Sequence, residues 1–73
     1  MMKDININNH PQRNFILGMG KEQLINRKRY VSMAVDNWKA NKYNVDSEFQ
    51  KYNINYFEIE HKLIECALAN NAT

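Results

Sequence analysis

The spacing of apolar residues in the last third of the chain constrains the fold most. From Val45 onward they recur at alternating steps of four and three residues: Val45, Phe49, Tyr52, Tyr56, Ile59, Leu63 and Cys66. This spacing lines them up on one side of an α-helix. Glu58, Glu60, Lys62 and Glu65 fall between them, on the expected solvent side. The sequence predicts a helix over residues 46–69, opened by a capping box of Ser47 and Gln50.

A second apolar stripe, of Val31, Ala34, Val35 and Trp38, predicts a helix over residues 21–43 that packs on the first. Pro11 favours a helix start and Gly18 and Gly20 a helix end, which predicts a short helix over residues 11–20. A single helix through residue 43 is one alternative, because Leu17, Leu24, Val31 and Trp38 are seven apart. A helix that begins afresh with Asn26 as its N-cap is the other. Asn41 and Asn44 tolerate the left-handed backbone that ends helices.

The first nine residues allow two interpretations. Ile5 and Ile7 alternate with polar residues, which is typical of a half-buried strand, and a polar tail is the alternative. The expected fold is therefore a mainly α single domain, 1–73, with two longer helices, one short helix and a strand or tail over residues 1–9. A chain of 73 residues buries a marginal core, and its one cysteine, Cys66, forms no internal disulfide. We therefore expect a partner chain, in a homodimer or a docked complex.

Several function classes are disfavoured. His10, His61 and Cys66 lack metal-ligand spacing, so we expect no metal and no cofactor. No histidine stands near Ser32 or Ser47 in the sequence, so we expect no catalytic residues, no small-molecule substrate and no enzyme. No apolar run approaches the ~20 residues that span a bilayer, so we expect no membrane partner. A single cysteine suits a reducing compartment, and we expect a cytoplasmic protein.

Charge divides the chain into two halves. Residues 1–44 carry eight Lys and Arg against three Asp and Glu, whereas residues 45–73 carry two against five. Three consecutive cations, Arg27, Lys28 and Arg29, follow Asn26 in the basic half. An ordinary solvated charge run explains them, and phosphate binding at a helix N-terminus is the functional alternative.

Residues 3–42 resemble the ribbon-helix-helix DNA-binding proteins, the class of the Arc and MetJ repressors. The resemblance lies in the alternating run 3–8 and in Val35-Asp36-Asn37-Trp38-Lys39, which is similar to the end of the family's second helix. It implies a dimer whose paired strands enter the major groove, with Asp4, Asn6 and Asn8 facing the bases and Ile5 and Ile7 buried. It also implies that Asn26, Arg27 and Lys28 hold a phosphate.

Three features depart from that family. Asp4 is an anion where the groove favours a cation, Gly18 and Gly20 weaken the first helix, and Leu24-Ile25-Asn26 replaces the usual Gly-x-Ser/Thr turn. We therefore keep two predictions. The first is a DNA-binding regulator acting through Asn6, Asn8, Asn26, Arg27, Lys28 and Arg29. The second is a helical protein-interaction module, such as an inhibitor, adaptor or antitoxin-like binder, acting through Phe49, Tyr52, Tyr56 and Phe57.

Overall fold

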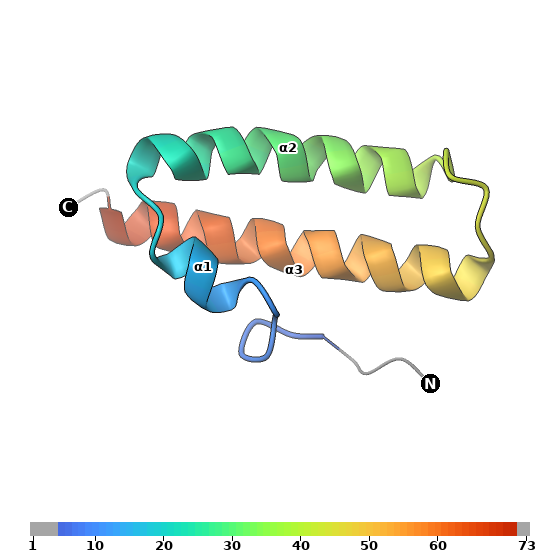
Figure 1. Cartoon of the computed structure of the whole chain (residues 1–73), viewed down its shortest axis with the longest axis horizontal. Helices are drawn as coiled ribbons and strands as arrows, with labels where there is room; N and C mark the ends of the chain where they lie inside the picture. The colour runs from blue at the N-terminus through green and yellow to red at the C-terminus, as the bar shows by residue number, and fades with distance from the viewer. Residues whose placement is uncertain (1–4, 72–73) are drawn as a thin grey trace.

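Two long helices form an antiparallel hairpin, and a short helix packs beside them (Figure 1). The computed structural model describes residues 5–71 of the chain. Helix α1 spans Arg13–Leu17, α2 spans Lys21–Lys39 and α3 spans Ser47–Asn71. Helices α2 and α3 lie side by side, and α1 packs on α3 near the start of α2 (Figure 1). The predicted mainly α fold, with two longer helices and a short one, is confirmed.

Two glycines separate α1 from α2, so the alternative of one continuous helix is wrong. Gly20 has an extended backbone, with ψ 168°, and its N–H donates to Oε1 of Gln23 over 3.2 Å. Leu17 ends α1, and Gly18 follows it. The short helix covers less than residues 11–20, because residues 11 and 12 form a turn before Arg13.

The connection between the long helices contains two left-handed residues. Asn41 and Asn44 both have φ 52°, which agrees with the expectation that asparagines end this helix. The helix itself ends at Lys39, before the predicted residue 43. At the start of α3, Oδ1 of Asp46 accepts the N–H of Phe49 over 2.9 Å. Asp46 is therefore the capping residue in place of the predicted Ser47, because its carboxylate reaches a free N–H of the first turn.

The core lies between α2 and α3 and is closed at one end by α1. Its buried apolar residues are Ile16, Leu24, Val31, Ala34, Leu63, Ile64 and Ala67. Val35 and Ile59 are partly buried against this cluster, as the expected packing of the two long helices requires. Trp38 is half-buried at the far end of the hairpin. The fold is elongated, with extents of 42 × 23 × 14 Å, so its core is thin.

The buried stripe of α3 is rotated from the predicted one. Ala67 and Glu60 are buried and Cys66 is exposed, so two expectations are wrong: a buried Cys66 and a solvent-facing Glu60. A helix has 3.6 residues per turn, so a seven-residue repeat drifts by ~20° per heptad, or ~60° over three heptads. Extrapolating the repeat from Val45 thus points the far end of the stripe in the wrong direction.

Residues 5–9 form a turn and not a strand. Oδ1 of Asn6 accepts the N–H groups of Asn8, at 2.9 Å, and of Asn9, at 3.1 Å. The asparagine side chain thus takes backbone donors that a strand would offer to a partner. The rest of the predicted strand, including Lys3 and Asp4, lies outside the described residues.

Buried His10 connects the N-terminal segment, residues 5–12, to α3 through hydrogen bonds and a ring contact. Its Nδ1 accepts the N–H of Gln12 over 3.0 Å, and its Nε2 lies 2.9 Å from the carbonyl oxygen of Tyr56. Because Nδ1 accepts a hydrogen bond, Nε2 carries the hydrogen and donates a hydrogen bond to the carbonyl oxygen of Tyr56. The imidazole also contacts the Tyr56 ring, with the ring centroids 4.4 Å apart.

Candidate functional site

The predicted DNA-binding cations of α2 point in different directions. Nε of Arg27 donates to Oε2 of Glu60 on α3 over 2.5 Å. The ammonium group of Lys28 lies 3.9 Å from a carboxylate oxygen of Glu65. Arg29 and Asn26 are exposed, and Arg29 forms no ion pair within residues 5–71. Consecutive residues of a helix lie about 100° apart, so the three cations do not form one surface.

The partner of Arg27 is a fully buried carboxylate. The hydrogen bond to Glu60 raises the pKa of Arg27, and burial opposes this more weakly. The guanidinium also lies 4.9 Å from the centroid of the Tyr30 ring. Oε1 of Glu60 is buried and has no hydrogen-bond partner among the described residues. Arg27 therefore balances a charge that the solvent does not reach, which is a structural role.

The two asparagines that the resemblance assigns to base contacts lie in the N-terminal turn. The side-chain oxygen of Asn6 accepts the N–H groups of Asn8 and Asn9, and Asn8 is exposed beside it. Neither lies in a strand within the described residues. The structure thus does not place Asn6 and Asn8 on a shared strand or helix surface with the cations of α2.

The aromatic residues predicted to bind a partner are partly used inside the chain. Phe57 packs against the core, and Tyr56 is half-buried against His10. Tyr52 is half-buried, and its ring centroid lies 6.5 Å from that of Tyr56. Phe49 is 39% exposed. Of the four predicted residues, Phe49 therefore presents the most apolar surface to a partner.

Phe49 belongs to an aromatic cluster that the sequence pattern did not reveal. Its ring meets the Trp38 ring edge-on, with the ring centroids 5.8 Å apart. The rings of Trp38 and Tyr43 are also in contact, with centroids 4.5 Å apart. Tyr43 is 52% exposed. We call Trp38, Tyr43 and Phe49 the aromatic end. These residues come from three successive segments, the end of α2, the connection and the start of α3, so only the folded hairpin brings them together.

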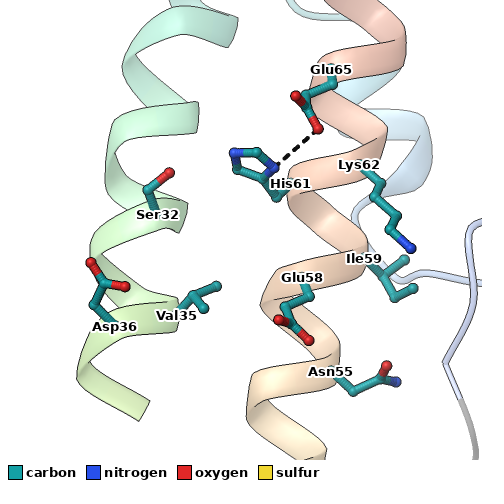
Figure 2. A pocket seen from close by; sticks show the side chains of 9 residues that line it. All are labelled: Ser32, Val35, Asp36, Asn55, Glu58, Ile59, His61, Lys62 and Glu65. Carbon is teal, nitrogen blue, oxygen red and sulfur yellow. Dashed lines mark ion pairs between the residues drawn. The ribbon is translucent and has the colours of Figure 1, made fainter. Parts of the chain in front are cut away.

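An open groove of about 440 Å³ runs between α2 and α3 (Figure 2). It is lined by Ser32, Val35, Asp36, Asn55, Glu58, Ile59, His61, Lys62 and Glu65. Nδ1 of His61 lies 3.3 Å from Oε1 of Glu65, the pair that is dashed in Figure 2. Three carboxylates line the groove against one lysine, Lys62, so we call it the acidic groove. Two of these carboxylates have a lysine partner, Glu58 with Lys39 at 3.4 Å and Glu65 with Lys28 at 3.9 Å.

The groove contains the residue types of a hydrolytic triad but not its geometry. Ser32 and His61 line the same groove from different helices, a proximity that their sequence separation conceals. Within residues 5–71, however, the Ser32 hydroxyl forms no hydrogen bond to His61. Both residues also lie inside long helices, whose backbone N–H groups are used in helical bonds and cannot stabilise an oxyanion. A nucleophilic role for Ser32 thus has no support in this geometry.

No group of three metal-ligating side chains occurs within the described residues. Nor does any helix of residues 5–71 have the length and apolarity needed to cross a membrane. Comparison with protein-family models, with curated proteins and with solved structures finds no match to this chain.

Proposed function

We propose that this chain is a small non-enzymatic helical module that binds a partner protein through its aromatic end. The observation that carries the proposal is the contact of Trp38, Tyr43 and Phe49, two of which are substantially exposed. Tryptophan and tyrosine are the side chains most enriched among those that dominate binding energy. Exposed rings held by one another present a large apolar area without a further loss of side-chain freedom on binding.

The connection between the helices holds the aromatic end in place. Nε2 of Gln50 donates to the carbonyl oxygen of Trp38 over 2.9 Å, which ties α3 to the end of α2. Oδ1 of Asn41 accepts the N–H of Val45 over 3.2 Å. The cap at Asp46 fixes the first turn of α3, which carries Phe49. A fixed connection reduces the ordering cost that a partner would otherwise meet.

The expected partner surface is an apolar side chain beside an acidic group. Lys42 is exposed next to Tyr43 and forms no ion pair within the described residues. A carboxylate of the partner beside an inserted apolar side chain would satisfy both features. We also propose a cytoplasmic location, because Cys66 is exposed and a reducing compartment would keep this thiol free.

DNA binding has less support than partner binding. Arg27 and Lys28 face carboxylates of α3, and residues 5–9 do not form the ribbon that the resemblance implies. Phosphate binding needs cations that are free to exchange their counterions for the nucleic acid. DNA binding stays a prediction, and its test is given in the Discussion.

The proposal is tested by site-specific photo-crosslinking followed by titration. A photoreactive residue replaces Tyr43, and in a control it replaces exposed Glu22, at the opposite end of α2. A protein crosslinked from position 43 and not from position 22 is then purified. Its affinity is measured through the fluorescence of Trp38, the single tryptophan of the chain.

Two variants decide the outcome. We expect Tyr43→Ser and Phe49→Ser each to weaken binding by roughly tenfold or more, about 1.4 kcal/mol. Phe15→Ser is the matched control, because Phe15 is exposed on α1, outside the aromatic end. Equal affinities for all three variants would overturn the aromatic end as the binding surface.

A further inference from the structure

The outward side of α2 carries a second set of unpartnered residues. Ile25 is 39% exposed and Met33 is 65% exposed, while Arg29, Ser32 and Asp36 lie between and beside them in exposed positions. Helix α2 forms one edge of the molecule (Figure 1), and within this set Ser32 and Asp36 also line the groove beside α3. We call Ile25, Arg29, Ser32, Met33, Asp36 and Ala40 the outer face of α2.

The charges around the outer face are segregated. A shallow hollow of about 500 Å³ is lined by Ile25, Lys28, Arg29, Ser32 and Met33, so its charged groups are cations. The acidic groove described above begins on the other side of Ser32, where Asp36 and Glu58 lie (Figure 2). Ser32 lines both depressions. The two depressions therefore meet at Ser32, and also where Lys28 of the hollow lies 3.9 Å from Glu65 of the groove.

The positions of the outer face are symmetric about one point of the helix, and the residues at symmetric positions differ in type. Measured from the midpoint between Ser32 and Met33, Arg29 and Asp36 are equally far away, and so are Ile25 and Ala40. Positions 25, 29, 32 and 36 follow the four-three-four spacing of a helix-packing surface. A two-fold axis through that midpoint would place each Arg29 opposite an Asp36 of the other copy.

We propose that the outer face of α2 binds a second copy of this chain, with the two α2 helices antiparallel. In this dimer Arg29 and Asp36 form two equivalent ion pairs across the axis, since neither forms an ion pair within residues 5–71. Ser32 lies against Met33 of the partner copy, and Ile25 against its Ala40.

The outer face of α2 is complementary to itself in charge. A two-fold interface pairs a patch with itself, so it requires a patch that carries both charges in a symmetric order. Arginine and aspartate at equal distances from the axis meet this requirement, and a single-sign patch does not. The small side chain of Ser32 permits a close approach of the two backbones, while Ile25 and Met33 supply apolar area. The aromatic end is separate from this face, so the dimer does not depend on the proposed function.

Charge reversal tests this proposal. Sedimentation equilibrium from micromolar to millimolar concentration should show the wild-type mass rising from 8.7 kDa to twice that value. Arg29→Asp alone and Asp36→Arg alone each place like charges across the axis, and we expect dissociation constants raised by roughly tenfold or more. An equimolar mixture of these two variants restores opposite charges on both sides, so we expect it to form a heterodimer.

Two controls separate this interface from loss of folding and from association elsewhere. Circular dichroism should show unchanged helix content in both variants, because both positions are exposed. Lys51→Glu changes an exposed charge on α3 and should leave the mass unchanged. A monomeric wild type at every concentration would overturn the proposal, and so would single variants that still dimerise or a mixture that stays monomeric.

Discussion

Nε of Arg27 on α2 lies 2.5 Å from Oε2 of Glu60 on α3, and the Glu60 side chain is fully buried. This pair joins the two long helices, and the Arg27 side chain is itself 29% exposed. Burying an ion pair costs desolvation energy, which offsets much of the attraction between the two charges. Removing one partner is strongly destabilising, because the other charge is then buried without compensation. The basic run that first suggested DNA binding therefore contains a residue that the fold itself requires.

Removing Arg27 should destabilise the hairpin strongly. Arg27→Met leaves the Glu60 carboxylate buried without a counter-charge, and we expect a loss of about 3–5 kcal/mol in the free energy of unfolding. Urea denaturation followed by circular dichroism measures this loss. The double variant Arg27→Met/Glu60→Leu should recover most of it, and a double variant as unstable as the single one would contradict this account.

The same pair should contribute no pH dependence through Arg27 near neutrality. Its pKa is raised in the folded state, so its contribution is complete below the pKa of the unfolded chain. That contribution is lost only when the pH rises through the still higher folded value, in strongly alkaline solution.

His10→Ala should release the N-terminal segment and α1 while the long helices stay folded. The substitution removes the hydrogen bonds of His10 to Gln12 and to Tyr56. Hydrogen exchange should therefore show faster exchange of the amides of Arg13–Leu17, with little change in the middle of α2 and α3. Unchanged protection of α1 would show that the packing of Ile16 alone fixes this segment.

Asn44 tests the left-handed connection. At φ 52°, residues that carry a Cβ are strained, with asparagine and aspartate the common exceptions. Asn44→Ala should therefore lower the free energy of unfolding by about 1 kcal/mol. Asn44→Gly removes the Cβ and should be neutral or stabilising. Thermal melts of the two variants measure the difference, and equal melting temperatures would argue against a left-handed residue at this position.

Trp38→Ala should cost less than a substitution in the centre of the core. Trp38 is half-buried, so we expect a loss below the ~3–5 kcal/mol that truncation of a buried tryptophan causes. Ile64→Ala is the reference, because Ile64 is fully buried and should cost ~2–5 kcal/mol. Urea denaturation of both variants compares them. A larger loss for Trp38→Ala would show that the aromatic end is essential for folding.

The competing DNA-binding function is tested by measuring duplex-DNA affinity against salt concentration. Because Arg27 and Lys28 face carboxylates, we expect weak binding with a shallow salt dependence. Each phosphate that is neutralised would contribute about −0.9 to the log–log slope. A steep slope that Lys28→Ala and Arg29→Ala each reduce by about one would make DNA binding the better-supported function.

Much of the architecture follows from local sequence patterns. The apolar spacing of residues 45–66 is sufficient to identify a long helix. Gly18 and Gly20 have low helix propensity and indicate a possible helix break between α1 and α2. Asn41 and Asn44 likewise mark a helix end, because asparagine tolerates positive φ. These features depend on backbone preferences within a few residues, which a single sequence records directly.

The candidate surfaces, by contrast, depend on how the helices are rotated. The drift between the seven-residue repeat and the true helical turn decides that Glu60 is buried and that Cys66 is exposed. The contact between Trp38 and Phe49 requires the closed hairpin. The sequence by itself therefore determines the two long helical segments and the breaks that are possible between them, whereas the structure decides that α1 and α2 are separate. The tertiary structure decides which charges are neutralised inside and which apolar groups remain outside, because packing sets the rotation of each helix about its axis.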